Sequence, residues 1–277
     1  MTGIFNYIDR QSPVHRLTGA TKLACLILWT LAAMTTFDTR LLAIMPVVSI
    51  TLFFVSKIKF KEVKVLFWFT FVFMIVNNVL IFLFSPENGV NIYGTRTEIC
   101  HLFWRYYLVK EQLFYHLNVV LKYLATIPVV ILFVSTTDPS EFASSLNRIG
   151  LSYKTAYAVS IALRYIPDIQ REYHDISTAQ QARGLEMASR KQSTIKRLKN
   201  AVAMVFPLII SSMDRIEIIS NAMELRGFGK NKKRTWYSSR PFRAADYIAI
   251  VFCILLMLAS LYLNFFVNGS RFFNPFI

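Results

Sequence analysis

The sequence has little charge, few acidic residues and few cysteines, and each shortage excludes a class of protein. Only 17% of the 277 residues are charged, against about 25% in a typical soluble domain, so an ordinary soluble enzyme is disfavoured. Cys25, Cys100 and Cys253 are widely separated and form no CxxC pair. The sequence therefore indicates neither a disulfide framework nor a zinc site. It contains no HExxH pair and no P-loop, so metalloprotease activity and ATP hydrolysis by this chain are not predicted.

Apolar and basic residues are abundant instead. Hydrophobic residues make up 55% of the chain, 24 residues are Phe, and the net charge is +15 from 31 basic and 16 acidic residues. Long apolar segments in a bilayer must satisfy their own backbone hydrogen bonds, which favours helices. We therefore predict an all-α membrane protein with about five transmembrane helices and a cytoplasmic helical coupling module.

The predicted organisation follows from the apolar segments, since a spanning helix needs roughly 17–25 mostly apolar residues. Residues 1–137 form a membrane domain, 138–245 a cytoplasmic coupling domain, and 246–277 the last transmembrane helix with a C-terminal tail. The transmembrane helices are expected at about 19–37, 41–56, 65–84, 118–137 and 247–267.

The short loops set the expected orientation, because Lys and Arg concentrate on the cytoplasmic side. Arg10 and Arg16 precede the first span and Lys22 lies at its beginning, and four lysines at positions 57, 59, 61 and 64 lie between the second and third. The N-terminus is therefore expected inside and, after five crossings, the C-terminus outside. Residues 138–245, which carry 18 of the 31 basic residues, then fall in the cytoplasm.

A basic run lies near the end of the coupling region, at Lys230, Lys232, Lys233 and Arg234. Beside a membrane crossing, its expected partner is anionic lipid of the bilayer. Nucleic-acid binding is disfavoured, because no recognised nucleic-acid module accompanies the run.

The coupling region contains an internal repeat. Two uncharged runs, 155–163 and 200–213, are too short to span and favour buried or interfacial helices. Two apolar stripes with the spacing of one helix face accompany them, and every stripe position recurs after 40 residues, as Pro167 recurs at Pro207. The stripes, which we expect to pack the two helices together or under the membrane arm, are Ile166, Ile169, Tyr173 and Ile176, then Phe206, Ile209, Met213 and Ile216.

Both helices of the repeat are predicted to end in an Arg-Gly pair. Glycine just past the last helical residue is a common left-handed cap, which leaves the arginine at a helix terminus. A single Arg-Gly helix end is common, because arginine complements the helix dipole. Two of them on parallel helices predict a pair of docking points for a two-fold or pseudo-two-fold partner. The residues concerned are Ala182, Arg183, Gly184, Leu225, Arg226 and Gly227.

Five sequence motifs occur along the chain: SPVHRL at 12–17 with Lys22-Leu23, TTDPSEF at 136–142, LRYIP at 163–167, AQQARG at 179–184 and AMELRGF at 222–228. With these motifs the chain resembles the transmembrane (T) component of energy-coupling-factor (ECF) transporters, the EcfT/CbiQ family of ABC-type importers. The resemblance covers almost the whole chain, although residues 85–117 match no motif. Leu225 stands where the family often has Ala.

The resemblance implies a non-catalytic subunit of a bacterial or archaeal cell membrane, with no catalytic, cofactor-binding or metal-binding residues of its own. Two cytoplasmic ABC ATPase subunits, identical or different, split ATP. A separate substrate-binding (S) membrane subunit carries the vitamin or transition metal, such as cobalt or nickel. Arg183 enters one ATPase and Arg226 enters the other.

Two other functions compete with this interpretation. A membrane-embedded enzyme, either an intramembrane protease or a lipid-modifying enzyme, needs ionisable pairs inside its spans. The predicted spans contain only Lys22 at an edge and Lys122 near an end. A simple anchor that binds acidic lipid is the third possibility, and it leaves the two Arg-Gly helix ends without a function.

Overall fold

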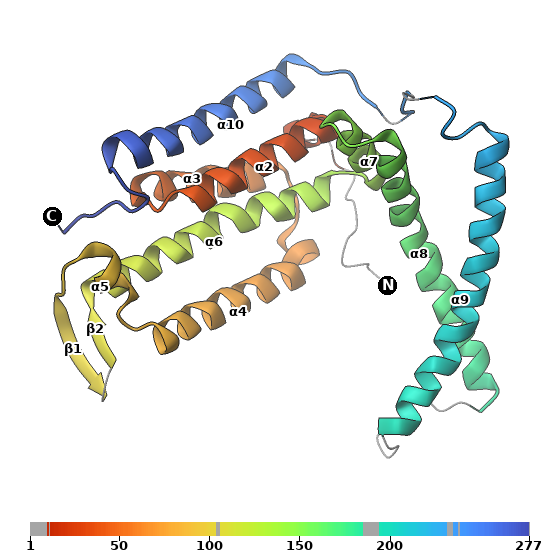
Figure 1. Cartoon of the computed structure of the whole chain (residues 1–277), viewed down its shortest axis with the longest axis horizontal. Coiled ribbons are helices and arrows are strands. Elements are labelled where there is room, and N and C mark those ends of the chain that lie inside the picture. Colours follow the sequence, from red (N-terminus) through yellow and green to blue (C-terminus); the bar gives the residue numbers. More distant parts are fainter. Residues whose placement is uncertain are drawn as a thin grey trace. The chain divides into compact units, whose positions relative to one another are not determined.

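The computed structural model describes residues 10, 12–103, 106–184, 194–231, 235–237 and 239–276. Within these ranges the chain is helical apart from one small hairpin (Figure 1). Lys232, Lys233 and Arg234 of the predicted basic run lie outside the described residues. The elements are α1 Pro13–Arg16, α2 Gly19–Thr35, α3 Thr39–Val55, α4 Phe60–Phe84, α5 Asn88–Tyr93, β1 Glu98–Phe103, β2 Tyr106–Val109, α6 Lys110–Thr136, α7 Pro139–Arg148, α8 Tyr153–Ala182, α9 Thr194–Leu225, α10 Ala244–Tyr262 and the π-helical turn η1 Leu263–Val267.

The apolar helices confirm the predicted class, an all-α membrane protein. Phe60–Phe84, Lys110–Thr136 and Ala244–Val267 are long and apolar enough to cross a bilayer, while α2 and α3 are shorter apolar helices. Helices α4 and α6 begin several residues before the predicted spans at 65 and 118. Polar residues such as Lys61 and Gln112 continue a helix beyond its apolar segment, so hydropathy locates the apolar part rather than the helix end.

The core of the membrane helices lies around α2, α3, α6 and α10. Helix α6 packs on α2, α3, α4 and α5, and α10 packs on α2. Trp29 is 2% exposed, and its indole Nε1 donates a hydrogen bond to the backbone oxygen of Ala125 at 2.9 Å. The small residues Ala32 and Ala33 are fully buried beside it, which lets the helix backbones approach closely.

Helix α4 lies at the edge of this bundle. Only 6% of its most apolar window is buried within the chain, against 33% for α6. Its side chains at Trp68, Phe69 and Phe84 are more than 60% exposed. A helix that is apolar all round and unburied needs lipid or another membrane protein around it.

Residues 85–117, which match no sequence motif, contain α5 and the antiparallel pair β1–β2, in which Glu98 faces Val109 and Cys100 faces Leu108. The fully buried carboxylate of Glu111 fixes the segment before the hairpin. It accepts hydrogen bonds from the backbone N–H of Thr97 at 3.1 Å and from its hydroxyl at 2.9 Å. The hairpin is therefore tied to the first turn of α6.

The C-terminal tail folds back over the ends of α2, α3 and α5. Phe272 stacks on Phe37 with ring centroids 4.5 Å apart, and Asn274 donates to the backbone oxygen of Tyr93 at 3.0 Å. Asn268 donates to the buried carboxylate of Asp38 at 2.9 Å. Aromatic stacking and satisfied polar groups thus hold the tail on the bundle.

The chain divides into two units. One contains the described residues up to Ser145 and from Arg240 onward, and the other contains residues 146–239. The second unit is shorter at each end than the coupling domain predicted at 138–245, because the beginning of α7 and residues 240–245 belong with the membrane helices.

The second unit consists mainly of α8 and α9 (Figure 1). Both helices continue through their prolines, Pro167 and Pro207. The uncharged runs at 155–163 and 200–213 are therefore not separate helices, and in the chain by itself many of their side chains are exposed, for example Val202 and Phe206.

Candidate functional site

The end of α8 presents the first Arg-Gly pair to solvent. The helix ends at Ala182, and the N–H of Arg183 still reaches the backbone oxygens of Ala179 and Gln180 at 3.2 and 3.1 Å. Gly184 then turns the chain with φ +88°, and no atom lies within 4 Å of where a Cβ would stand. Ala182, Arg183 and Gly184 are all exposed, so the predicted left-handed cap and the accessible arginine are both present.

The end of α9 forms a complete Schellman motif, the left-handed helix end with two backward hydrogen bonds. Gly227 has φ +65° and donates to the backbone oxygen of Glu224 at 2.9 Å, and Phe228 donates to that of Met223 at 2.9 Å. Leu225 is 90% exposed and Arg226 is also exposed. The apolar Leu225 in place of a family Ala therefore stands at the surface beside the arginine.

The residue after this second glycine fixes the end of α9 to the start of α8. The Phe228 ring lies 5.1 Å from the ring of Tyr153 and 4.9 Å from that of Tyr157. Trp236 continues the cluster, since its Nε1 donates to Asn147 Oδ1 at 3.1 Å. The sequence motif AMELRGF contains this phenylalanine, but its partners only become visible in the fold.

Helices α8 and α9 run in opposite directions and cross (Figure 1). At the crossing, Arg215 of α9 donates to Glu172 of α8 at 3.0 Å, and the hydroxyl of Ser211 donates to the same carboxylate. The Arg215 guanidinium also lies 5.7 Å from the ring of Tyr165. The expectation of parallel helices is therefore wrong for this pair. Only eleven positions in the sequence separate Ala182 from Thr194, and a short connection favours antiparallel neighbours.

This arrangement separates the two arginines. Arg226 lies at the end of the pair where Phe228 meets Tyr157, and Arg183 lies at the other end of α8. Arg183 follows Tyr157 by 26 residues in the sequence, which at 1.5 Å per residue corresponds to roughly 40 Å along the helix. The two arginine ends are therefore well separated, each presented at one end of the crossed pair.

An apolar groove of about 690 Å³ lies between α8 and α9. The stripe residues border it or lie on the free faces rather than packing helix to helix, since Ile166 is 49% exposed and Ile216 is 64% exposed. Direct packing of the two stripes is therefore not observed. Residues that line the groove include Ala162, Tyr165, Ile169, Ile216, Ile219 and Met223.

Ion pairs on α8 differ in how well they are protected. Glu172 pairs with Arg215 while their side chains are 18% and 36% exposed. Asp168 and Arg171 lie 3.9 Å apart on the open surface of α8.

Among the described residues, no three His, Cys, Asp or Glu side chains are grouped as metal ligands would be. The described part of the second unit thus presents two cationic helix ends, an apolar groove and the interhelical ion pair of Glu172 and Arg215.

Comparison with known proteins gives the family. The sequence matches the family described as CbiQ, cobalt transport protein, over residues 10–237. The energy-coupling factor transporter transmembrane protein EcfT of Brevibacillus brevis is 27% identical over 272 residues, which cover 92% of this chain and 95% of that protein. The protein of the same name from Bacillus subtilis is 25% identical, covering 91% and 94%.

A shorter and more similar match comes from Limosilactobacillus fermentum, whose EcfT is 33% identical over 130 residues. That match spans 44% of this chain and about half, 48%, of the relative. The match to the family itself extends through both Arg-Gly helix ends, because residues 10–237 include Arg183 and Arg226. The chain therefore belongs to the CbiQ family of multi-pass membrane transport proteins, which its motifs predicted.

Proposed function

We propose that this chain is the scaffold and transducer subunit of an ECF-type ABC importer. It has no catalytic role itself and couples ATP hydrolysis by two cytoplasmic ATPase subunits to uptake of a vitamin or transition metal. The cargo is carried by a separate substrate-binding membrane subunit. The proposal places the N-terminus and the second unit in the cytoplasm and the C-terminus outside.

The observation that carries the proposal is the pair of arginines at opposite ends of α8 and α9. Arginine stays charged and forms fork-shaped hydrogen bonds to carboxylates and carbonyl oxygens. Two such ends, roughly 40 Å apart along a rigid helix, suit two partner subunits better than one binding groove. The caps built on Gly184 and Gly227 allow a partner surface to approach closely.

The groove between the helices supports the assignment of a third subunit. Its exposed apolar residues need a covering surface, and an exposed apolar patch on this scale marks an interaction site. An apolar membrane subunit provides a surface of that kind. ATP-driven closure of the two ATPases then displaces the crossed helices and, through them, the substrate-binding subunit.

Charge reversal of both helix ends tests the proposal. The variant Arg183→Glu/Arg226→Glu, expressed with its ATPases, is expected to lose them on purification, because truncation of a desolvated arginine anchor alone costs about 2 kcal/mol or more, or roughly thirtyfold in affinity. Each single variant keeps one docking point and is expected to retain part of the ATPase. Densitometry of the purified complex from membranes gives the stoichiometry.

Arg171→Glu is the matched control. Its side chain is 81% exposed on the same helix and lies 3.9 Å from Asp168, so the variant is expected to bind the ATPases normally. Co-purification of both ATPases with the double variant at wild-type yield contradicts the proposed docking role. Absence of any ATPase from the wild-type complex contradicts the proposed function as a whole.

A further inference from the structure

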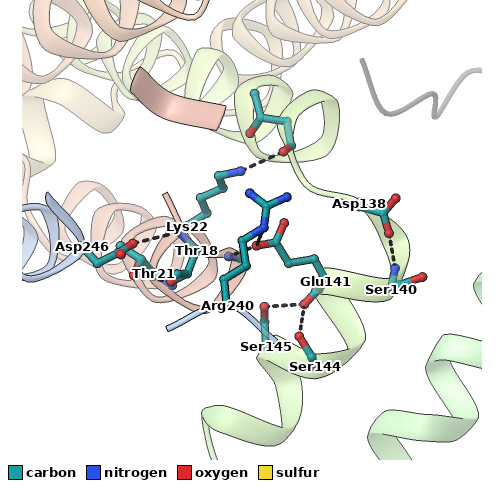
Figure 2. A network of polar contacts seen from close by, with 12 residues as sticks. Thr18, Thr21, Lys22, Asp138, Ser140, Glu141, Ser144, Ser145, Arg240 and Asp246 are labelled. Carbon is teal, nitrogen blue, oxygen red and sulfur yellow. Dashed lines mark hydrogen bonds and ion pairs between the residues drawn. The ribbon is translucent and has the colours of Figure 1, made fainter. Parts of the chain in front are cut away.

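Two sequence motifs that are more than one hundred positions apart in the chain meet within the first unit. Figure 2 shows residues of the segment 18–22 and of TTDPSEF in one polar network with Arg240 and Asp246. The backbone N–H of Thr18 donates to Asp246 Oδ1 at 2.8 Å, and that of Gly19 donates to Glu141 Oε1 at 2.9 Å. Two carboxylates from distant parts of the chain thus cap the N-terminal end of α2, where the helix dipole favours negative charge.

Three of the four charged side chains of the network are buried, and its two carboxylates are balanced by two cations. Glu141 is 6% exposed, Asp246 1% and Lys22 7%. The Lys22 Nζ donates to the backbone oxygen of Thr136 at 2.8 Å, at the end of α6, and Arg240 lies 3.9 Å from Glu141. Buried charges are tolerated when they are paired and hydrogen-bonded, and loss of one partner leaves the others uncompensated.

Gly19 shows how closely α2 and α7 approach. A Cβ at this position would lie 2.6 Å from Ser145 Oγ and 2.8 Å from Glu141 Cγ. The hydroxyl groups of Ser144 and Ser145 donate to the backbone oxygen of Glu141 at 2.8 and 2.6 Å. Backbone of α2 and side chains of α7 are therefore in direct contact, with no room for a side chain between them.

The network lies close in sequence to both points at which the chain connects the two units. The chain passes into the second unit after Ser145 and returns from it at Arg240. Glu141 lies four residues before the exit, and Asp246 lies six residues after the return. Asp246 also accepts from the N–H of Arg243 at 2.8 Å, so the returning segment is fixed at the start of α10. Both covalent connections are bound to one helix end.

We propose that Glu141 and Asp246 are positioning residues of transport, which bind both connections of the second unit to the N-terminal end of α2. A displacement of α8 and α9 is then delivered to α2 rather than absorbed in the connections. This inference rests on the proposed function for its role in transport, while the mechanical coupling itself is measured without any partner subunit.

The test measures interspin distances by double electron–electron resonance on the full chain in lipid nanodiscs. The three native cysteines are replaced by serine, and nitroxide labels are placed at Leu31→Cys on α2 and Met213→Cys on α9, which are 46% and 63% exposed. Glu141→Gln and Asp246→Asn are each expected to broaden the distance distribution at least twofold relative to the same labelled chain without them. A distribution as narrow as that of the parent chain overturns the proposal.

Controls separate positioning from general loss of structure. Asp138→Asn removes a neighbouring carboxylate that caps only the exposed N–H of Ser140 at 2.7 Å, and it is expected to leave the distribution unchanged. A label pair within the first unit, at Leu31→Cys and Val130→Cys, is expected to stay narrow in all variants. Broadening of that inner pair to the same extent means unfolding and overturns the positioning role.

A milder variant covers the case in which Glu141→Gln does not fold. Arg240→Gln changes a side chain that is 55% exposed and is expected to broaden the distribution by a smaller factor, about 1.5. A wrong proposed function gives a different result: the purified wild-type complex then contains no ATPase, while these distance distributions still show the expected pattern. An unchanged distribution in Arg240→Gln and Asp246→Asn together overturns the proposal.

Discussion

Arg215 of α9 donates a hydrogen bond to Glu172 of α8 at 3.0 Å, and this pair holds the crossing of the two helices. The carboxylate is more protected than the guanidinium, with side-chain exposures of 18% and 36%. Ser211 donates to the same carboxylate, so Glu172 has partners at two positions on α9. The crossing point is polar although the groove beside it is apolar.

Glu172→Gln is expected to lower the apparent melting temperature of the purified protein by about 1–3 °C. A partly exposed ion pair contributes roughly 0.2–1 kcal/mol, and about 1 kcal/mol shifts the midpoint by ~2–4 °C in a domain of this size. Asp168→Asn is the control, because its pair with Arg171 is 3.9 Å long and exposed. Equal shifts for both variants contradict a special role of the crossing pair.

Gly227→Ala is expected to destabilise the end of α9 by about 1 kcal/mol, because a residue with a Cβ is strained at φ +65°. No atom lies within 4 Å of the position that a Cβ would take, so the cost comes from the backbone and not from a clash. Gly227→Asn is expected to recover much of the loss, since asparagine tolerates this conformation. Thermal unfolding compares the two variants, and identical midpoints for Ala and Asn argue against the cap.

The apolar groove gives a prediction about the third subunit. Ile216→Glu places a charge on a groove residue that is 64% exposed and is expected to reduce co-purification of the substrate-binding subunit at least tenfold while both ATPases remain. Burial of an unpaired carboxylate at an interface is costly. Ile195→Glu is the control, on the same helix but outside the groove and 81% exposed. Unchanged binding by Ile216→Glu contradicts groove docking.

Phe272→Ala tests the attachment of the C-terminal tail. The ring stacks on Phe37 at 4.5 Å and meets Tyr93 edge-on at 6.3 Å, and each aromatic pair contributes about 0.5–1.5 kcal/mol beyond its buried area. We expect a melting temperature lower by several degrees and faster proteolysis of the tail. Phe266→Ala, which removes an 80% exposed ring, is expected to change neither. Equal proteolysis of both variants contradicts a folded-back tail.

Much of the fold could be predicted because the relevant signals are local. Hydropathy marks the apolar helices, and glycine after a helix marks the caps at Gly184 and Gly227 with positive φ. The positions of Arg183 and Arg226 relative to the two prolines also indicate where each helix ends: Leu225 follows Pro207 by 18 residues, whereas Ala182 follows Pro167 by 15. Local spacing is preserved in a helix regardless of tertiary context.

The remaining features depend on contacts between distant parts of the chain. The direction of α9 relative to α8, the partner of Glu172 and the rings around Phe228 are not encoded by any single segment. The network of Glu141 and Asp246 joins residues more than one hundred positions apart, so its motifs are visible in the sequence but their meeting is not. The hairpin at 98–109 is short, and local patterns identify such strands poorly.

The aromatic cluster at Phe228 makes the two arginine ends unequal. The Arg226 end is braced against Tyr153 and Tyr157, whereas Arg183 sits on a cap in open surroundings at Gly184. Among the described residues, the two helix ends of this single chain therefore differ in their local packing. In the proposed function, two identical ATPase subunits would accordingly meet two unlike surfaces on one scaffold.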